Sequence, residues 1–455
     1  MQPVLTVADM QAVDATAATT TPLDELVARA GTAVARAALD LLGGAYGRRV
    51  VVVAGRGNNG GDGRVAARVL AARGARVRVV APGDTDRIGF DGLRVDLVVD
   101  AAFGTGFRGR YDAPEVAPGI PVLAVDIPSG VAGDSGAAVG RVLAADRTVT
   151  FVAPKPGLLQ GDGARLAGDV RVVDIGLPVG EYRIALVEDA DVARMLPGRD
   201  PGGNKWAAAV LVVAGSPGMT GAAGLCADAA YRAGSGMVRL GVPGAALDDL
   251  PSTEAVGVGL AADDWAGPAV EVAGRCRAVV VGPGLGRADG TGAQVRHLVA
   301  GSPAPVVVDA DGLTVLGRVD REPPGSEAPV VLTPHDGEYA HLLGEAPGPD
   351  RVAAARRLAA AAGAVVLLKG PTTAVADPAG RVLLARTGTP ALATAGTGDV
   401  LSGVIAAFLA RGVPPLEAAA LGAHVHGRAG SLGHRGGLVA GDLPALVARV
   451  LDALG

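Results

Sequence analysis

The stretch RVVVVAGRGNNGGDGRVAARVLAARG, residues 49–74, indicates how the first half of the chain folds. Its opening run, Arg49–Ala54, is short and rich in Val, which is typical of a strand buried on both faces of a parallel sheet. A glycine-rich loop follows, and then an Ala-, Leu- and Arg-rich segment typical of a helix. Such a loop places backbone N–H groups and a positive helix terminus where a phosphate can bind. Gly55, Gly57 and Gly60 also fit the GxGxxG fingerprint of dinucleotide sites, although a plain tight turn uses the same glycines.

The alternation of strand and helix continues outward from this stretch. A helix is expected near residues 22–42, because Thr21 can cap it, Pro22 suits its first turn and acidic residues follow. Strands that alternate with helices predict a mostly parallel sheet covered on both faces. The strands expected in this half are Arg49–Ala54, Arg76–Ala81, Val95–Asp100, Pro121–Asp126, Arg147–Val152 and Val170–Asp174.

A second α/β series begins after residue 205 and uses different glycine motifs. The alternation fades across residues 183–205, where charges, prolines and glycines gather. We therefore expect an α/β fold with two unlike domains, residues 1–188 and 206–455, joined by a linker at 189–205. The strands expected in the second domain are Ala208–Ala214, Met237–Val242, Ala278–Val281, Pro305–Asp309, Val330–Leu332, Ala364–Leu368 and Thr373–Ala376.

The composition limits the classes of protein to which this chain can belong. The chain has 455 residues, of which 49% are hydrophobic and 19% charged, so it can bury large cores and is not disordered. Its net charge is −5 and 3% of its residues are aromatic, which argues against nucleic acid as a partner. The first basic residue is Arg29 and no apolar run reaches the ~18 residues of a membrane span, so we expect a cytoplasmic protein that binds no membrane. Cys226 and Cys276 have no CxxC or Cys/His partner and are expected to be buried, reduced thiols.

Lysine and asparagine are scarce in this chain. Lys155, Lys205 and Lys369 are the only lysines among 41 basic residues. Where arginine is otherwise preferred, a lysine indicates a position that needs a compact ammonium group, which a planar guanidinium cannot replace. Lys155 and Lys369 carry more weight than Lys205, because both follow expected strands in Pro- and Gly-rich turns. Apart from Asn204, the only asparagines are the adjacent pair Asn58–Asn59 in the glycine-rich loop.

Polar residues that can hold ligands follow several strands of the first half. The carboxyl ends of parallel strands share one edge of a sheet, and ligands bind at this edge. Asn59, Asp100, Asp126 and Ser129 can gather oxygen atoms around a cation there. The loop Gly104–Arg110 offers a further place for a phosphate. A turn or a helix cap explains each acid alone equally well, but four such strand ends in one domain favour a site.

The most informative motif of the second half is TAGTGD, residues 394–399, which opens an expected helix. Glycine N–H groups and the helix N-terminus form an anion hole there, with the carboxylate of Asp399 beside it. This arrangement suits phosphoryl transfer, because the hole stabilises the moving phosphoryl group while Asp399 accepts a hydroxyl proton. A simple helix-capping role for Asp399 is the alternative. His335 by itself is a turn or core histidine, and His424 and His426 are expected to be structural and not metal ligands.

The motifs GNNGGDG, DAAFGTGFRG, VDIPSG and PKPG resemble the YjeF N-terminal family of NAD(P)HX epimerases over about residues 1–185. The resemblance implies a Rossmann-like doubly wound sheet and potassium bound by Asn59, Asp100 and Ser129. Its substrate is the 6-hydroxy adduct of NADH or NADPH, in which the carbon that bears the hydroxyl is bonded to the ring nitrogen. The residues implied to hold this substrate are Asn58, Asn59, Gly60, Gly61, Asp62, Gly104, Thr105, Gly106, Phe107, Arg108, Gly109, Arg110 and Asp126.

A carbon of this kind inverts readily. The nitrogen lone pair expels the hydroxyl and water returns on the other face, so a positioned acid or base suffices. We assign this catalytic role to Asp126, with Lys155 nearby.

The AGTGD turn resembles the ribokinase-like superfamily, and AGS with TGA, GPGLG, TPHDGE and LKGPTTAV resemble its NAD(P)HX dehydratase branch over about residues 190–455. The resemblance implies a ribokinase-like α/β sandwich that uses ADP or ATP with magnesium. Hydroxide is a poor leaving group, and its phosphorylation makes elimination easy. The segment GGNKWAAAV, residues 202–210, departs from the family's His-Lys-Gly run, so no substrate contact is carried over to Asn204–Trp206. The implied residues are Ala222, Gly284, Gly286, His335 and Asp399 for the hydrated cofactor, and Lys369, Gly370, Pro371, Thr372, Thr373 and Gly398 for ADP.

The sequence thus predicts a bifunctional enzyme whose first domain interconverts the R and S forms of hydrated NADH or NADPH and whose second domain dehydrates the S form. The catalytic residues expected are Asp126, Lys155 and Asp399, and the partners expected are these small molecules, ADP and further copies of the chain in a homo-oligomer. A kinase for a small hydroxylated vitamin precursor, with a non-catalytic N-terminal binding domain, shares the anion hole and is the alternative. A purely dimerising or partner-binding N-terminal domain is a third possibility.

Overall fold

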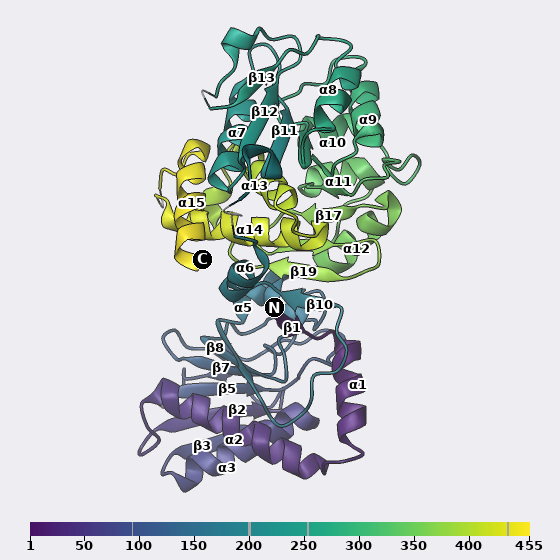
Figure 1. Ribbon diagram of the computed structural model, residues 1–455. Coiled ribbons are helices and arrows are strands. Elements are labelled where there is room, and N and C mark those ends of the chain that lie inside the picture. Colours follow the sequence, from purple (N-terminus) through teal and green to yellow (C-terminus); the bar gives the residue numbers. More distant parts are fainter. Residues whose placement is uncertain (93, 199–201, 253, 435) are drawn as a thin grey trace. The chain divides into compact units, whose positions relative to one another are not determined.

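The computed structural model describes residues 1–92, 94–198, 202–252, 254–434 and 436–455 (Figure 1). The described chain divides into two compact units, Pro3–Tyr182 and Arg183–Gly455, the latter joined by Met1–Gln2. This division lies before the expected boundary at residue 188, because strand β10 (Ile184–Leu186) and helix α6 (Asp189–Met195) belong to the second unit. Much of the expected linker is therefore structured, and its residues 199–201 lie outside the described residues.

The first unit is built on a six-stranded sheet. Every neighbouring pair in it is parallel. In space the strands follow the order β3-β2-β5-β7-β8-β9. These strands are β2 (Arg49–Ala54), β3 (Arg76–Val80), β5 (Leu97–Ala101), β7 (Val122–Val125), β8 (Arg147–Phe151) and β9 (Asp169–Val173), and a small separate pair is formed by β4 (Arg87–Ile88) and β6 (Glu115–Val116).

The helices of this unit are unevenly shared between the two faces of the sheet. Helices α2 and α3 pack on one face and share a core with alternate residues of β2, β5, β7 and β8. The other face is covered mainly by loop residues between 103 and 145, which form a core with Val51 and Val98. The helices are α1 (Val7–Ala17), α2 (Leu23–Leu42), α3 (Asn58–Ala72), α4 (Pro156–Leu159) and α5 (Gly161–Leu166).

The second unit is built on an eleven-stranded sheet. It is parallel from β13 through β11 to β17, and β18 runs antiparallel to both of its neighbours. In space the order is β1-β10-β19-β18-β17-β16-β15-β14-β11-β12-β13. These strands are β1 (Gln2–Val4), β10, β11 (Ala209–Val213), β12 (Met237–Gly241), β13 (Val256–Val258), β14 (Ala278–Val281), β15 (Val306–Val308), β16 (Val330–Leu332), β17 (Val365–Leu368), β18 (Thr373–Ala376) and β19 (Val382–Ala385).

Helices cover both faces of this sheet. Helices α7, α13, α14 and α15 share one large core with alternate strand residues. Helices α8 and α12 contact strands β11 and β17 but contribute nothing to that core, so they lie on the opposite face. Besides α6, the helices are α7 (Gly221–Arg232), α8 (Ala266–Ala273), α9 (Thr291–Gly301), α10 (Asp311–Leu316), α11 (Asp336–Leu343), α12 (Arg351–Ala362), α13 (Thr397–Ala410), α14 (Pro415–Leu432) and α15 (Leu443–Leu454), with the 3₁₀ turns η1 (Lys205–Ala208), η2 (Leu247–Asp249), η3 (Pro390–Leu392) and η4 (Ala440–Asp442).

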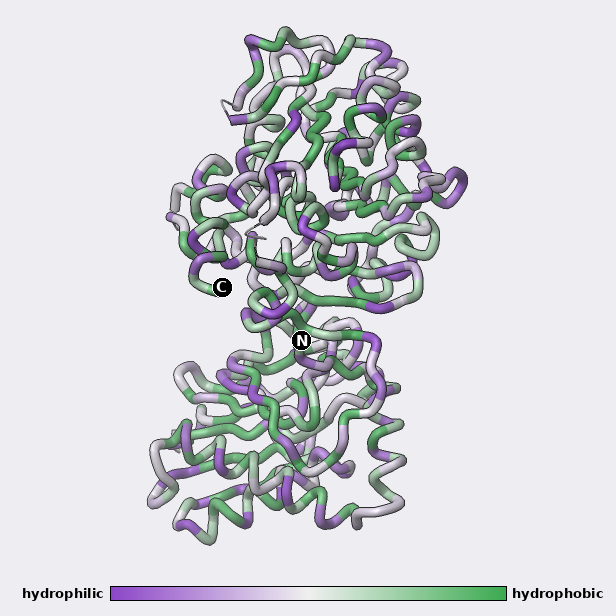
Figure 2. Tube along the Cα trace, viewed as in Figure 1, coloured by the Kyte–Doolittle hydropathy of each residue, from purple (hydrophilic) through white to green (hydrophobic). Residues whose placement is uncertain are grey.

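The expected α/β class with two unlike sheets is confirmed. Figure 2 shows hydrophobic residues following the strands, as expected for Val-rich strands buried on both faces. The expected strands are found with ends shifted by at most two residues. The helix expected near 22–42 is α2, although its N-cap is Pro22 and not Thr21. The sequence did not reveal β10, β13 and β19, which are short strands at or near the ends of the large sheet. No helix in the described ranges is long and apolar enough to cross a bilayer.

Helix α13 lies at the centre of the second unit and contacts α7, α14 and three strands (Figure 1). Almost all of its residues are buried, so it is hydrophobic on every side. A glycine allows it to approach α7 closely. A Cβ atom on Gly403 would lie 2.2 Å from the backbone oxygen of Cys226.

Gly403→Ala should therefore lower the free energy of unfolding by about 1–3 kcal/mol, because backbone atoms cannot move aside cheaply. Gly267→Ala is the matched control in helix α8, since its Cβ would meet no atom within 4 Å. It should leave stability unchanged or raise it by about 0.5–1 kcal/mol through helix propensity. Urea unfolding followed by circular dichroism measures both. An unchanged midpoint for Gly403→Ala would contradict the close approach of α7 and α13.

Candidate active sites

The first candidate site is a cleft of about 1110 Å³ in the N-terminal unit. The chain passes from β2 to its neighbour β3 and then returns to β5 on the other side of β2, so the strand order reverses at β2 and β5. Ligands bind doubly wound sheets at such a switch point, beyond the carboxyl ends of the strands. The loops that follow β2 and β5 line the cleft, together with residues of α1, α2 and the ends of β7 and β8.

A lysine–aspartate pair lies in the wall of this cleft. Lys155 Nζ donates to Asp126 Oδ1 at 2.7 Å, and the lysine side chain is 1% exposed. Thr105 donates to the other carboxylate oxygen of Asp126 from its backbone N–H at 2.8 Å and from its hydroxyl at 2.5 Å. Burial raises the pKa of Asp126, but the charge of Lys155 and the hydrogen bonds from Lys155 and Thr105 outweigh it, so the pKa lies below its usual value. Asp126 is therefore ionised.

The backbone around Asp126 is shaped for this position. Asp126 has φ +67°, in the left-handed region that non-glycine residues adopt only at a cost. The loop after β5 approaches it closely, because a Cβ atom on Gly104 would lie 2.9 Å from an oxygen of Asp126. Only glycine leaves room for both the carboxylate and the loop.

Two of the other carboxyl groups that line the cleft have raised pKa values. Asp62 is the fifth residue of α3 and is 7% exposed, and burial, followed by the charge of Asp126, raises its pKa to about 8. Burial also raises the pKa of Asp14, although Lys155 opposes this effect. The ionised Asp126 and the neutral Asp62 therefore have opposite proton states at neutral pH.

Most of the residues expected to hold the hydrated cofactor line this cleft. The residues brought together are Asn58, Asn59, Asp62, Gly104, Thr105, Gly106, Phe107, Arg108, Asp126 and Lys155. Gly60, Gly61, Gly109 and Arg110 do not line it. Gly60 serves packing, because its Cβ would lie 1.9 Å from the backbone oxygen of Gly55, and Arg110 pairs with Asp112 at 2.9 Å.

The three residues expected to bind potassium lie beside this cleft or within the core next to it. Asp100 Oδ2 accepts from the backbone N–H of Ser129 at 2.9 Å, and the Ser129 hydroxyl contacts the backbone of Phe103. Burial raises the pKa of Asp100, which is 1% exposed. The side-chain oxygen and nitrogen of Asn59 are both buried with no hydrogen-bond partner in the described part of the chain. An unpaired buried amide of this kind calls for a ligand.

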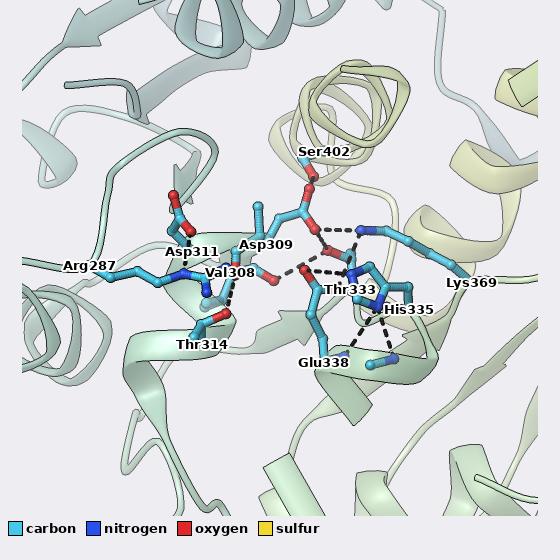
Figure 3. Close-up of polar contacts among 12 residues, drawn as sticks. Arg287, Val308, Asp309, Asp311, Thr314, Thr333, His335, Glu338, Lys369 and Ser402 are labelled. Atoms are coloured by element: carbon cyan, nitrogen blue, oxygen red, sulfur yellow. Dashed lines mark hydrogen bonds and ion pairs between the residues drawn. The ribbon is translucent and has the colours of Figure 1, made fainter. Parts of the chain in front are cut away.

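The second candidate site is centred on Asp309, directly after strand β15 (Figure 3). Lys369 Nζ donates to Asp309 Oδ1 at 2.6 Å, and Thr333 donates to the same oxygen at 2.7 Å. Ser402 of α13 donates to the other oxygen at 2.7 Å. Burial lowers the pKa of Lys369, but the charges of Asp309 and Glu338 outweigh it, so the pKa is raised and the ammonium group is retained.

The N-terminus of helix α13 lies beside this group of residues. Its N-cap is Gly396, with φ +89°, and the backbone N–H groups of Gly398 and Asp399 donate to no acceptor in the described chain. A Cβ atom on Gly398 would lie 3.5 Å from Lys369 Nζ and 3.7 Å from Asp309 Oδ2. Burial, followed by the charge of Asp309, raises the pKa of Asp399 to about 7. The N-terminus of α13, the ammonium group of Lys369 and the carboxyl group of Asp399 therefore lie near one another.

The other residues expected to bind the hydrated cofactor fall into two places. Ala222 and Gly284 are in contact, because a Cβ on Gly284 would lie 3.0 Å from the Ala222 methyl group. Gly286 donates its backbone N–H to Asp311 at 3.0 Å, which ties this loop to the segment after Asp309. His335 caps helix α11, since its Nδ1 accepts from two backbone N–H groups of the first turn.

The segment expected to hold ADP runs from Lys369 into strand β18. Among the residues of this segment, the Lys369 side chain is the one that contacts Asp309 in the described structure. Thr372 is buried, and Thr373 donates to the backbone oxygen of Gly370 at 3.4 Å. The backbone oxygen of Pro371 lies against Gly388, where a Cβ would come within 2.8 Å. The three residues after Lys369 thus form a turn between β17 and β18.

Sequence reasoning missed Asp309, Thr333, Glu338 and Ser402. Asp309 appeared only as the end of an expected strand, although VVVDADG places an acid after a Val-rich run as VVDAAFG does. Glu338 lies within the TPHDGE motif, and its carboxylate accepts from His335 N–H at 2.8 Å. The partners of Asp309 come from segments 24 to 93 residues away, so no local pattern could connect them.

Several residues expected to be structural are so. Cys226 and Cys276 are free and buried, and burial raises the pKa of both thiols. His424 Nε2 contacts Asp189 at 2.8 Å, and burial lowers the pKa of His426 to about 4. In the divergent segment, Asn204 caps η1 by accepting from Trp206 N–H at 2.9 Å.

Two family models match this chain. The NAD(P)H-hydrate dehydratase model matches residues 210–451, and the YjeF-related protein N-terminus model matches residues 23–89 and 81–157. The bifunctional NAD(P)H-hydrate repair enzyme Nnr of Salinibacter ruber is 38% identical, over 98% of this chain and 96% of the relative. The enzyme of the same name from Mycobacterium tuberculosis is 43% identical, over 83% of this chain and 82% of the relative.

A solved structure supports the match of the second unit. It is the ADP/ATP-dependent NAD(P)H-hydrate dehydratase from Bacillus subtilis, co-crystallised with ATP and Mg²⁺, with a TM-score of 0.51 and 30% identity over 59% of this chain and 98% of that one. The matches cover both units, and the Salinibacter ruber enzyme is matched over almost its full length. The chain therefore belongs to the family of bifunctional NAD(P)H-hydrate repair enzymes.

Proposed function

We propose that the chain repairs hydrated nicotinamide cofactors in two steps. The N-terminal unit interconverts the R and S forms of hydrated NADH or NADPH, and the C-terminal unit dehydrates the S form with the help of a nucleotide. The observation that supports this best is that each unit holds a Lys–Asp pair with one buried partner at the carboxyl edge of its sheet, beside a place for an anionic cofactor.

In the N-terminal unit the chemistry is proton transfer. The cleft of about 1110 Å³ is large enough for a dinucleotide. As the nitrogen lone pair expels the hydroxyl, positive charge develops on the ring. The ionised Asp126, held by Lys155 and Thr105, is positioned to stabilise this charge and to take a proton from the returning water.

In the C-terminal unit the chemistry is phosphoryl transfer followed by elimination. Asp399, with its pKa near 7, accepts the proton of the substrate hydroxyl as the phosphoryl group arrives. The free N–H groups of Gly398 and Asp399 and the ammonium group of Lys369 stabilise the charge on that phosphoryl group. We propose ADP as the nucleotide. Glu338, at 4.0 Å from Lys369 Nζ, is the carboxylate that fits the accompanying magnesium, which supplies further charge neutralisation.

Potassium is proposed for the N-terminal unit, with Asn59, Asp100 and Ser129 as its ligands. The unpaired amide of Asn59 and the buried carboxyl of Asp100 fit a cation that takes oxygen ligands. The homo-oligomer and the cytoplasmic location expected from the sequence stay predictions. Light scattering and cell fractionation test them.

Asp126→Asn should lower the rate of R-to-S conversion by about 10²–10⁴-fold, because the carboxylate that accepts the proton is lost. The same variant should dehydrate pure S hydrate at the wild-type rate. Asp399→Asn should show the reverse pattern, which makes each variant the folding control for the other. Chromatographic separation of the epimers and absorbance of the reduced nicotinamide measure the two rates. Equal loss of both activities in either variant would contradict the division of labour, and accumulation of a phosphorylated product would favour the vitamin kinase.

Dehydration should depend on pH through Asp399. Because its pKa is raised to about 7, the group is protonated and inactive as a base at lower pH. The rate at saturating S hydrate and nucleotide should fall about tenfold per pH unit below 7 and level off above it. Initial rates between pH 5 and 9 measure this. A rate that stays constant below pH 7 would exclude Asp399 as the base.

Potassium should affect only the first step. Replacement of potassium by choline at constant ionic strength should slow epimerisation and leave dehydration of pure S hydrate unchanged. Asp100→Asn should remove the potassium dependence. Epimerisation that is equally fast in choline would rule out the potassium site.

A further inference from the structure

The carboxyl group of Asp62 is unusual for a buried acid. The residue is 7% exposed and lines the cleft, yet its side chain makes no hydrogen bond or ion pair with any residue in the described ranges. A carboxylate left buried without a partner is costly, whereas the neutral acid is not. The burial and the lack of partners therefore favour the protonated form.

The other charged groups of the cleft do not neutralise Asp62. Asp126 forms an ion pair with Lys155 and accepts hydrogen bonds from Thr105, and its negative charge opposes ionisation of Asp62. The titratable and charged residues that line the cleft besides Asp62 are Asp14, Arg56, Asp84, Arg108, Asp126 and Lys155. The burial of Asp62 and the charge of Asp126 are the main effects on its pKa, and neither Arg56 nor Arg108 forms an ion pair with it in the described residues.

We infer that Asp62 is the acid that protonates the departing hydroxyl group during epimerisation, while Asp126 takes the proton from the water that returns. This inference rests on the proposed epimerase function and adds a second group to it. An acid is needed because hydroxide leaves poorly from carbon, whereas water leaves easily. A neutral carboxyl beside an ionised one supplies both halves of the proton transfer.

The step balances as follows. The carboxyl O–H of Asp62 gives its proton to the hydroxyl, the C–O bond breaks and water leaves. The electron pair of the ring nitrogen forms a C=N bond, which leaves a positive charge on the ring near Asp126. Water adds to the opposite face of the carbon and its extra proton passes to Asp126. Exchange with solvent then returns a proton from Asp126 to Asp62.

The position of Asp62 follows from the glycine-rich loop. Gly57 ends the loop and Asn58 begins α3, so Asp62, the fifth residue of the helix, lies close to the loop that lines the cleft. The helix N-terminus acts mainly on charges in the first turn, so burial determines the proton state of this acid. The raised pKa of about 8 is consistent with that outcome.

Asp62→Asn tests this role, because asparagine keeps the size of the side chain but cannot give up a proton. After subtraction of spontaneous conversion, wild-type kcat/KM for epimerisation should fall about tenfold per pH unit above pH 8, where Asp62 loses its proton. Asp62→Asn should lower kcat by about 10²–10⁴-fold at pH 7 and should lack this alkaline decline. Asp62→Glu should restore part of the rate and the alkaline decline. Asp40→Asn, an exposed acid on α2, is the matched control and should behave as wild type.

The outcomes separate the inference from the proposed function. If the wild-type protein does not accelerate epimerisation, the epimerase function itself is wrong. If the wild type does so and Asp62→Asn keeps the wild-type rate, or loses rate while keeping the alkaline decline, Asp62 is not the acid. Dehydration of pure S hydrate and the thermal melting curve check that the variant is folded. A rise in KM with unchanged kcat would assign Asp62 to substrate binding alone and would overturn the inference.

Discussion

A lysine–aspartate pair with one buried partner, at the carboxyl edge of a parallel sheet, is the interaction on which each unit depends. Lys155 holds Asp126 at 2.7 Å and Lys369 holds Asp309 at 2.6 Å. Removal of Asp126 or of Lys369 would leave the buried Lys155 or Asp309 without its charge partner, which is destabilising. A guanidinium group is too wide and too rigid for these positions, so a chain that otherwise uses arginine keeps lysine there.

The pairs also constrain the backbone that carries them. The acid must follow its strand directly and turn its carboxylate back over the sheet edge. In the N-terminal unit Asp126 itself has φ +67°, and in the C-terminal unit the residue after Asp309, Ala310, has φ +52°. Both are strained conformations for residues with a Cβ atom. Strain at the acid in one sheet and at the residue after it in the other indicates that fixing the position of the carboxylate outweighs the cost of the strained backbone.

Much of this arrangement could be predicted from the sequence, but only where the signal is local. Val-rich runs predicted most of the strands. The rarity of lysine identified Lys155 and Lys369 as candidate site residues from the sequence alone. The role of Asp309 could not be predicted, because its partners lie 24, 60 and 93 residues away and meet only in the folded sheet. Strand β10 was missed for the same reason, since its parallel partner β19 begins at Val382.

The expected cofactor-binding loops show a second limit of prediction from sequence motifs. A motif identifies a segment, but only some of its residues face the ligand. Gly60 belongs to the same motif as Asp62, yet it is needed for the close approach to Gly55 and not for the cleft. The periodicity of a helix and the path of a loop decide which residues face inward, and these depend on packing that a motif does not describe.

The two units treat the same chemical difficulty in different ways. In both proposed reactions a hydroxyl group must leave a carbon bonded to the ring nitrogen, and hydroxide leaves poorly. Exchange between epimers is reversible and needs only a proton, which a neutral acid in a shielded cleft can supply and recover. Dehydration must run in one direction, and phosphorylation of the hydroxyl provides both a good leaving group and the driving force. An anion hole is required only in that second case, which is why the free N–H groups at the start of α13 lie next to Asp309 and Lys369.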